Sequence, residues 1–111
     1  MKISSQDYND VTVVELQGEM DGDFAEALKN IITSTIARSR IRIVLDMSNV
    51  AFIDSQGLEL LFWVHDYCKR NRTQLRLAGL DENCKKILEI TRLESGFDLY
   101  AELAEAVKSF A

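Results

Sequence analysis

The chain has 111 residues, of which 47% are hydrophobic and 28% are charged, and its formal net charge is −5. This length and apolar content predict one domain over residues 1–111, with a core that needs neither a metal nor disulfide bonds. The negative charge argues against nucleic acid and against an anionic membrane surface as partners, because their phosphates would repel it.

The first third of the chain predicts a hairpin followed by a helix. Residues 11–16 are rich in β-branched side chains, and the segment 3–8 before them ends at an Asn-Asp pair at 9–10, which is a turn signal. From Phe24 to Arg38 apolar residues recur at helical spacing, and the Asp-Gly-Asp sequence at 21–23 offers capping groups for that helix.

The middle of the chain predicts alternating strands and helices. Ile41–Leu45 is a short apolar run, typical of a parallel strand buried on both faces. A loop is expected over Met47–Ile53, and a helix over Ser55–Asn71. Leu75–Gly79 predicts a further strand, and Glu82–Thr91 a third helix.

The last part of the chain completes an α/β pattern. Asp81 is a candidate cap for the third helix, residues 97–100 predict a short strand, and residues 102–110 have helical spacing. Two early strands followed by alternating helices and strands predict a mixed sheet of four to five strands with about four helices packed on it. No proline, repeat or low-complexity linker divides the chain.

The start of the sequence, the length of its apolar runs and its two cysteines predict an intracellular protein. No apolar segment of a signal peptide follows Met1, and the longest apolar run, Leu60 to Val64, is far too short to cross a bilayer. We therefore expect a cytoplasmic protein that does not insert into membranes. Cys68 and Cys84 fit neither a zinc site nor a disulfide framework, so we expect buried thiols and no cofactor.

The predicted helix over 55–71 carries two contrasting faces. The expected core stripe comprises Leu58, Leu61, Val64, His65 and Cys68. Trp63 falls on the other side, and its neighbours there are Gln56, Glu59, Asp66, Tyr67 and Arg70. Two interpretations of Trp63 stay open: an exposed anchor for a partner, or an aromatic packed beneath a neighbouring loop or the C-terminal helix.

Ser55 stands in a polar turn at the start of the same helix. The first N–H groups of a helix lack intrahelical partners, and the aligned peptide dipoles leave partial positive charge there. Asp54 or Ser55 can cap these donors, and a phosphate on Ser55 would meet the same groups. Local chemistry by itself favours an ordinary cap for Ser55.

Longer segments make the pattern specific. Residues 44–50 read VLDMSNV and residues 52–58 read FIDSQGL, and together they resemble the STAS-domain anti-sigma factor antagonists. The GEMD turn at 18–21, the LAGL segment at 77–80 and the ILEITRL helix at 87–93 extend this resemblance over nearly the whole chain.

The resemblance implies a partner-switching protein without catalytic activity. In that family, a serine or threonine after the aspartate is phosphorylated by a partner anti-sigma factor that is itself a serine kinase, and a metal-dependent serine phosphatase reverses the step. Ser55 matches that position. The unmodified protein would bind the anti-sigma factor and free a sigma factor, and the phosphorylated form would let go. The expected partner-binding residues are Asp21, Asp54, Gln56, Gly57, Glu59 and Trp63.

Some features qualify that expectation. Asp21 and Asp54 can also act as caps, a role that we favour for Asp21. Gln56 stands where the family often has a second small hydroxyl residue, so no backup phosphorylation site is expected. Because the same fold also serves lipid transport, the alternative is a non-switching STAS adaptor subunit, for example of a lipid transport complex. Either protein would be a monomer or a weak dimer.

Two other classes are poorly supported. A serine hydrolase needs a base beside Ser55, but His65 lies about ten positions along the same helix, roughly 15 Å away. A receiver domain could use Asp46 at the end of a strand, but the rest of its acidic and lysine constellation is missing. Asp46 is therefore expected to order the loop that follows it.

Overall fold

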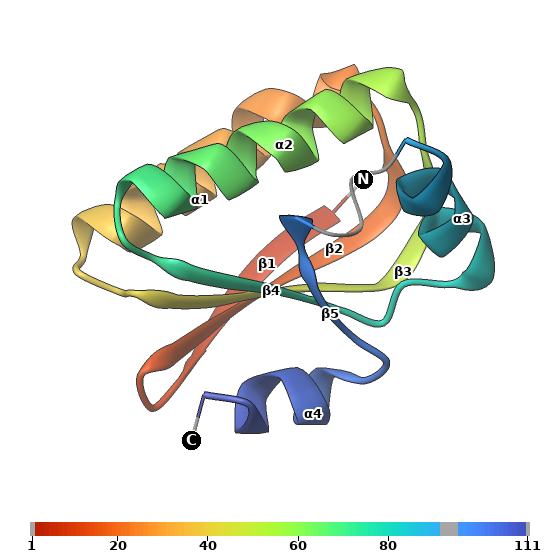
Figure 1. The fold of residues 1–111 in the computed structure, drawn as a ribbon. Coiled ribbons are helices and arrows are strands. Elements are labelled where there is room, and N and C mark those ends of the chain that lie inside the picture. The colour runs from red at the N-terminus through yellow and green to blue at the C-terminus, as the bar shows by residue number, and fades with distance from the viewer. Residues whose placement is uncertain (1, 92–95, 111) are drawn as a thin grey trace.

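A computed structural model describes residues 2–91 and 96–110, and over these residues the chain forms one five-stranded mixed sheet with helices on both faces (Figure 1). In sheet order, the strands are β1 (Lys2–Tyr8), β2 (Val11–Met20), β3 (Arg42–Ile53), β4 (Gln74–Ala78) and β5 (Asp98–Tyr100). β1 and β2 form the predicted antiparallel hairpin, and all later pairings are parallel.

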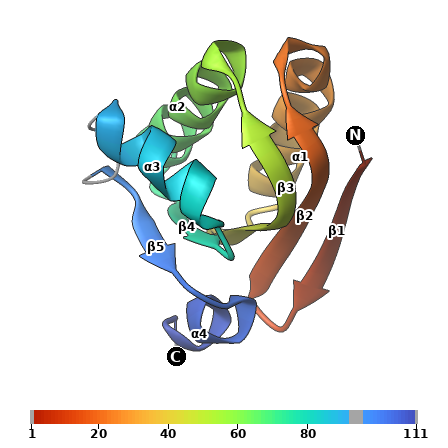
Figure 2. The ribbon, with the colours of Figure 1, turned by 90° about the vertical axis from the view of Figure 1, so that its right-hand side faces the viewer.

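The helices divide between the two faces of the sheet. They are the 3-10 turn η1 (Gly22–Phe24), α1 (Ala25–Ala37), α2 (Ser55–Arg70), α3 (Glu82–Ile90) and α4 (Leu103–Lys108). α1 and α2 lie above the sheet, and α4 crosses below it (Figure 2). The prediction of an α/β fold with four to five strands and about four helices is confirmed.

The predicted loop at 47–53 is wrong, because β3 continues through it to Ile53. Two polar residues at the start of this stretch bind each other within the strand. Asp46 Oδ1 accepts hydrogen bonds from the Ser48 backbone N–H at 3.1 Å and from Ser48 Oγ at 2.6 Å. β2 follows β3 over this stretch through two register shifts, so ladder pairing overrides the local turn preference.

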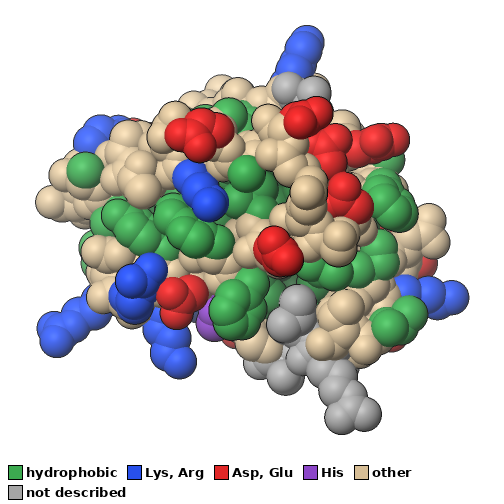
Figure 3. Space-filling view, turned by 90° about the horizontal axis from the view of Figure 1, so that it is seen from above, with side chains coloured by type: hydrophobic (Ala, Val, Ile, Leu, Met, Phe, Trp, Pro, Cys, Tyr) green, Lys and Arg blue, Asp and Glu red, His purple; other side chains and the backbone are tan. Residues whose placement is uncertain are grey.

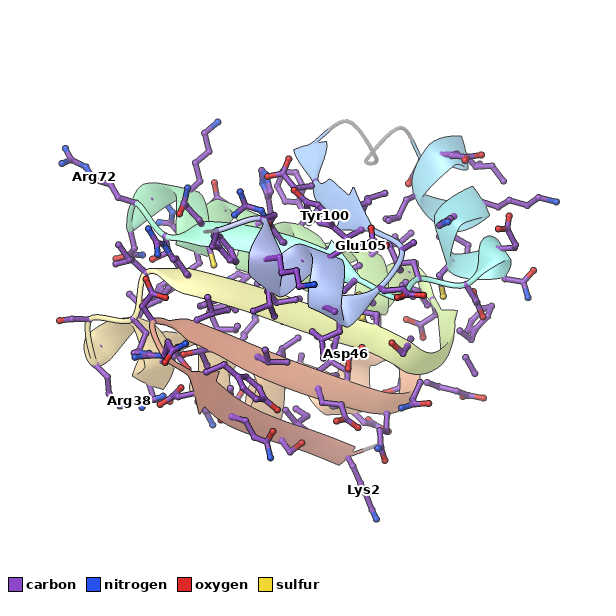
Figure 4. All side chains as sticks on the ribbon, turned by 90° about the horizontal axis from the view of Figure 1, so that it is seen from below. Lys2, Arg38, Asp46, Arg72, Tyr100 and Glu105 are labelled. Atoms are coloured by element: carbon purple, nitrogen blue, oxygen red, sulfur yellow. The ribbon has the colours of Figure 1, made fainter. Side chains whose placement is uncertain are left out.

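The core consists of two apolar layers. The larger one lies between the sheet and α1, α2 and α3, and it includes Leu16, Leu45 and Leu61, all fully buried. The smaller one lies under α4. There the Phe110 ring sits 3.8 Å from the Arg76 guanidinium carbon, and Tyr100 lies beside the helix (Figure 4). The chain thus covers part of its lower sheet face with its own C-terminal helix.

The start of α2 is locked against the end of β2. The Asp54 N–H donates to the Met20 carbonyl oxygen at 3.2 Å. A Cβ atom on Gly57 would lie 2.2 Å from that same oxygen and 3.0 Å from the Met20 carbonyl carbon. Only a residue without a side chain lets the helix approach the strand so closely, which sets both the position and the rotation of α2.

Both cysteines are buried and free, as the sequence predicts. Cys84 lies against the Val50 carbonyl, and Cys68 is in the last turn of α2. Burial disfavours the thiolate and raises the pKa of each thiol to about 12.

Gly57→Ala should lower the free energy of unfolding by about 1–3 kcal/mol, because the added methyl group meets a backbone carbonyl that cannot move aside. Urea denaturation followed by circular dichroism measures this. Gly22→Ala is the matched control: its Cβ would meet only the end of the Gln56 side chain, which can swing away. Equal stability of both variants would contradict the proposed close contact.

Neither native thiol should react with a thiol reagent at pH 8, whereas both should react in urea. The folded state keeps Cys68 and Cys84 protonated above the pH at which unfolded thiols ionise. Their contribution to stability is therefore complete below about pH 8.5 and declines above it. Labelling of either native thiol at the rate of a free cysteine would contradict this.

Candidate functional site

Ser55 is the first residue of α2, and it is exposed. The helix cap is Asp54, whose Oδ1 accepts a hydrogen bond from the Gly57 N–H at 2.8 Å. The interpretation of Ser55 as the cap is therefore wrong. Because the neighbouring aspartate takes that role, the hydroxyl of Ser55 is left at the surface, available to another protein.

Backbone donors remain at this terminus for an incoming anion. Of the first four N–H groups, that of Asp54 bonds to the Met20 carbonyl and that of Gly57 bonds to the Asp54 side chain. The N–H groups of Ser55 and Gln56 have no intrahelical acceptor, as expected for the first turn of a helix. A phosphate at this position would meet two donors and the positive end of the helix dipole.

The turn after β2 lies beside this site. Asp21 caps the 3-10 turn by accepting from the Asp23 N–H at 3.1 Å, so its expected capping role is confirmed. The next residue, Gly22, packs under the side chain of Gln56. The structure therefore brings the segment with Asp21 against the start of α2, although the two are more than thirty residues apart in the sequence.

The expected contact residues differ in accessibility. Ser55, Gln56 and Glu59 are exposed, and Asp54 is partly buried. Gly57 is buried against β2, so its contribution to the site is the close approach of the helix.

Trp63 matches neither interpretation fully. It is partly buried against the core, its ring stacks on Tyr67 with centroids 4.9 Å apart, and the Lys29 ammonium lies 5.1 Å above it. It therefore packs against α1 and not beneath a loop or the C-terminal helix. It lines a groove of about 350 Å³ between α1 and α2, which also includes Gln56 and Glu59.

Phe62 is the exposed aromatic of α2, and sequence reasoning missed it. Its side chain is 55% exposed, and it follows Ser55 by seven residues, close to two helical turns, so both lie on one side of α2. Leu58 lies between them, and the three residues share this side with a shallow hollow of about 360 Å³ lined by Leu58, Glu59, Phe62 and Thr91. The i, i+7 spacing from Ser55 was the available signal.

The core stripe of α2 is shifted from the predicted one. The buried residues are Gly57, Leu60, Leu61, Val64 and Cys68, whereas Leu58 and His65 are only partly buried. The contact of Gly57 with β2 turns the helix so that Leu60 faces the core. The His65 ring packs edge-on against Phe97, with centroids 5.0 Å apart, as a partly buried structural residue.

Charge is distributed unevenly between the two ends of the molecule. Acidic side chains gather over the end at which α1 and α2 begin, and basic ones over the opposite end (Figure 3). The basic end includes Arg38, Lys69, Arg70 and Arg72, which follow or close the two helices. This arrangement complements the dipoles of both helices and makes the surface around Ser55 acidic.

Among the residues that the structure describes, no three His, Cys, Asp or Glu side chains come together as a metal site would require. No described helix is both long enough and apolar enough to span a bilayer.

This chain is similar in sequence and in fold to known proteins. Residues 2–106 match the STAS domain. The anti-sigma-F factor antagonist RsfB of Mycobacterium tuberculosis is 36% identical over 105 residues, which cover 95% of this chain and 85% of RsfB. An anti-sigma factor antagonist of Mycobacterium paratuberculosis, of known crystal structure, is 27% identical with a TM-score of 0.85, covering 97% of this chain and 92% of that one.

The fold is also that of Bacillus SpoIIAA, solved in its phosphorylated form, with a TM-score of 0.77 at 18% identity over 99% of this chain and 100% of SpoIIAA. The match to the domain and the identity to RsfB extend over nearly the entire chain. The chain therefore belongs to the STAS domain family, among its anti-sigma factor antagonists.

Proposed function

We propose that this protein acts in the cytoplasm as the antagonist of a partner-switching pathway. Its unphosphorylated form binds an anti-sigma factor that is also a serine kinase, and a sigma factor is released. Phosphorylation of Ser55 blocks this binding, and a serine phosphatase restores it. The observation that carries the proposal is the exposed Ser55 hydroxyl beside the capping carboxylate of Asp54.

A kinase bound in trans can reach this hydroxyl without any unfolding, because Ser55 is exposed and the cap is supplied by another residue. After transfer, the phosphate lies near the two unpartnered N–H groups of the first turn. The same fold occurs in SpoIIAA in a phosphorylated form, which supports a domain that accommodates the modification. We therefore expect local release of the partner and no global conformational change.

The proposed contact surface centres on Ser55 and extends along the exposed side of α2 to Phe62. An exposed apolar side chain next to a modifiable group can pack into the partner while the serine stays in the contact. A phosphate inside such a contact must lose its water, and Ser55 directly follows Asp54 and precedes Glu59 by about one helical turn. We expect a loss of several kcal/mol, and each 1.4 kcal/mol is about tenfold in affinity.

Ser55→Asp should weaken binding of the purified anti-sigma factor by about a hundredfold or more, whereas Ser55→Ala should bind as well as the wild type. Titration calorimetry measures both affinities. Incubation with that kinase and ATP should add one phosphate, which mass spectrometry assigns to Ser55. Phosphate only elsewhere, or equal binding by all three forms, would favour the non-switching adaptor.

Phe62→Ala should weaken binding of the unphosphorylated protein by about tenfold, because it removes an exposed aromatic from the proposed contact. Unfolding in urea should be unchanged within about 0.5 kcal/mol, since the side chain is half exposed. Ile41→Ala is the matched control, as Ile41 is similarly exposed just before β3, at the opposite end. If both substitutions have the same effect on binding, α2 is not the contact surface.

A further inference from the structure

The hollow between β1, the end of β2 and α1 has no role in the function proposed above. It encloses about 680 Å³, and its lining residues are Ile3, Glu19, Asp21, Asp23, Phe24, Ala27 and Ile31. Phe24 is buried, and Ile3 and Ile31 are partly buried, so the floor is apolar. Three carboxylates stand on the rim, and none of the seven lining residues is basic. The hollow therefore combines an apolar floor with uncompensated negative charge.

β1 borders this hollow and is the outer strand of the described sheet, bonded to β2 on one side (Figure 2). Tyr8 and Val11 flank the two-residue turn of the hairpin. The residues at these positions form a hydrogen-bonded pair of the antiparallel ladder. By the alternation of an antiparallel ladder, Ile3, Ser5 and Asp7 direct their backbone N–H and C=O groups away from β2. These groups can pair with an additional strand.

We propose that this cleft and the free edge of β1 together bind an extended segment of a protein partner that presents both apolar and basic residues on one face. The segment adds to β1 as a sixth strand, so its backbone pairs with the groups of Ile3, Ser5 and Asp7. Every second side chain of the segment faces the cleft. On that face the apolar side chains pack above Ile3, and the basic ones lie toward Glu19 and Asp23.

Charge complementarity selects this occupant over others. An acidic or phosphorylated segment would be repelled by Glu19, Asp21 and Asp23, and a purely apolar one would leave the carboxylates desolvated without partners. Strand addition needs no change in the fold, because the edge is already formed. The interaction does not depend on the phosphorylation of Ser55, although the Asp21 turn lies against the start of α2.

The test uses the full chain and the synthetic peptide acetyl-KTVTKTV-amide, in which lysine and valine share one face of the strand, with acetyl-ETVTETV-amide for comparison. In an NMR titration of the isotope-labelled protein at low salt, the basic peptide should shift the amides of β1 and of the residues around the cleft. The acidic peptide should shift none. The basic peptide with N-methyl groups on the residues whose N–H groups would face β1 should bind more weakly, because it cannot form those hydrogen bonds. Absent shifts, or shifts confined to other surfaces such as the Phe62 side of α2, would overturn the proposal.

Two pairs of substitutions distinguish the effect of the cleft carboxylates from the effect of the net charge of the protein. The double substitution Glu19→Gln with Asp23→Asn should weaken binding at least about threefold, and it leaves the Asp21 cap intact because that bond uses the backbone of residue 23. Glu82→Gln with Glu89→Gln, on exposed positions of α3, changes the charge equally and should bind as the wild type does. If both pairs of substitutions weaken binding equally, the effect comes from net charge, and the proposed site is wrong.

A third variant tests the hollow itself. Ala27→Trp fills the cleft from an exposed position of α1 and should abolish binding of the basic peptide. Ser55→Asp should bind this peptide as the wild type does, so a failure of the switch at Ser55 and a failure of the cleft are distinguishable. Full binding by Ala27→Trp would show that the peptide does not use the hollow.

Discussion

The contact between the Met20 carbonyl and the start of α2 is the constraint on which the functional surface depends. It joins the end of a strand to the first turn of a helix more than thirty residues later, and it requires glycine at position 57. Because the approach is so close, α2 can neither slide nor turn relative to the sheet. Asp54 is held where it caps the helix, and Ser55 is held one residue beyond it, at the surface.

The same geometry explains how a form with a phosphate on Ser55 and a form without it can share one fold. The two helices that begin at this end direct their dipoles toward it, and acidic side chains balance them (Figure 3). The cation nearest to the α1–α2 groove, Lys29, lies over the ring of Trp63. A phosphate on Ser55 would therefore meet backbone N–H groups at the helix terminus, and its remaining charge would face solvent or a partner. Such an arrangement favours control of binding over internal rearrangement.

Local chemistry made much of the fold predictable. The turn at 9–10, the apolar run at the start of β3 and the aspartate cap of α3 each depend on residues close in sequence, and each is present in the structure. The segment 47–53 was not predictable in this way. Its polar residues resemble a turn, but a neighbouring strand with two register shifts keeps it extended. Pairing between distant segments decided that element.

For the candidate site, the sequence by itself determined that an aspartate and a serine stand at the positive end of a helix, because capping and the dipole act within one turn. Which of the two caps the helix was decided by the structure, in which Asp54 binds the Gly57 N–H. Tertiary structure alone decided which aromatic is exposed. A helical wheel gives the angles between side chains but not the rotation of the helix against its neighbours. That rotation follows from the contact of Gly57 with β2, and Lys29 of α1 then lies over Trp63, while Phe62 stays at the surface.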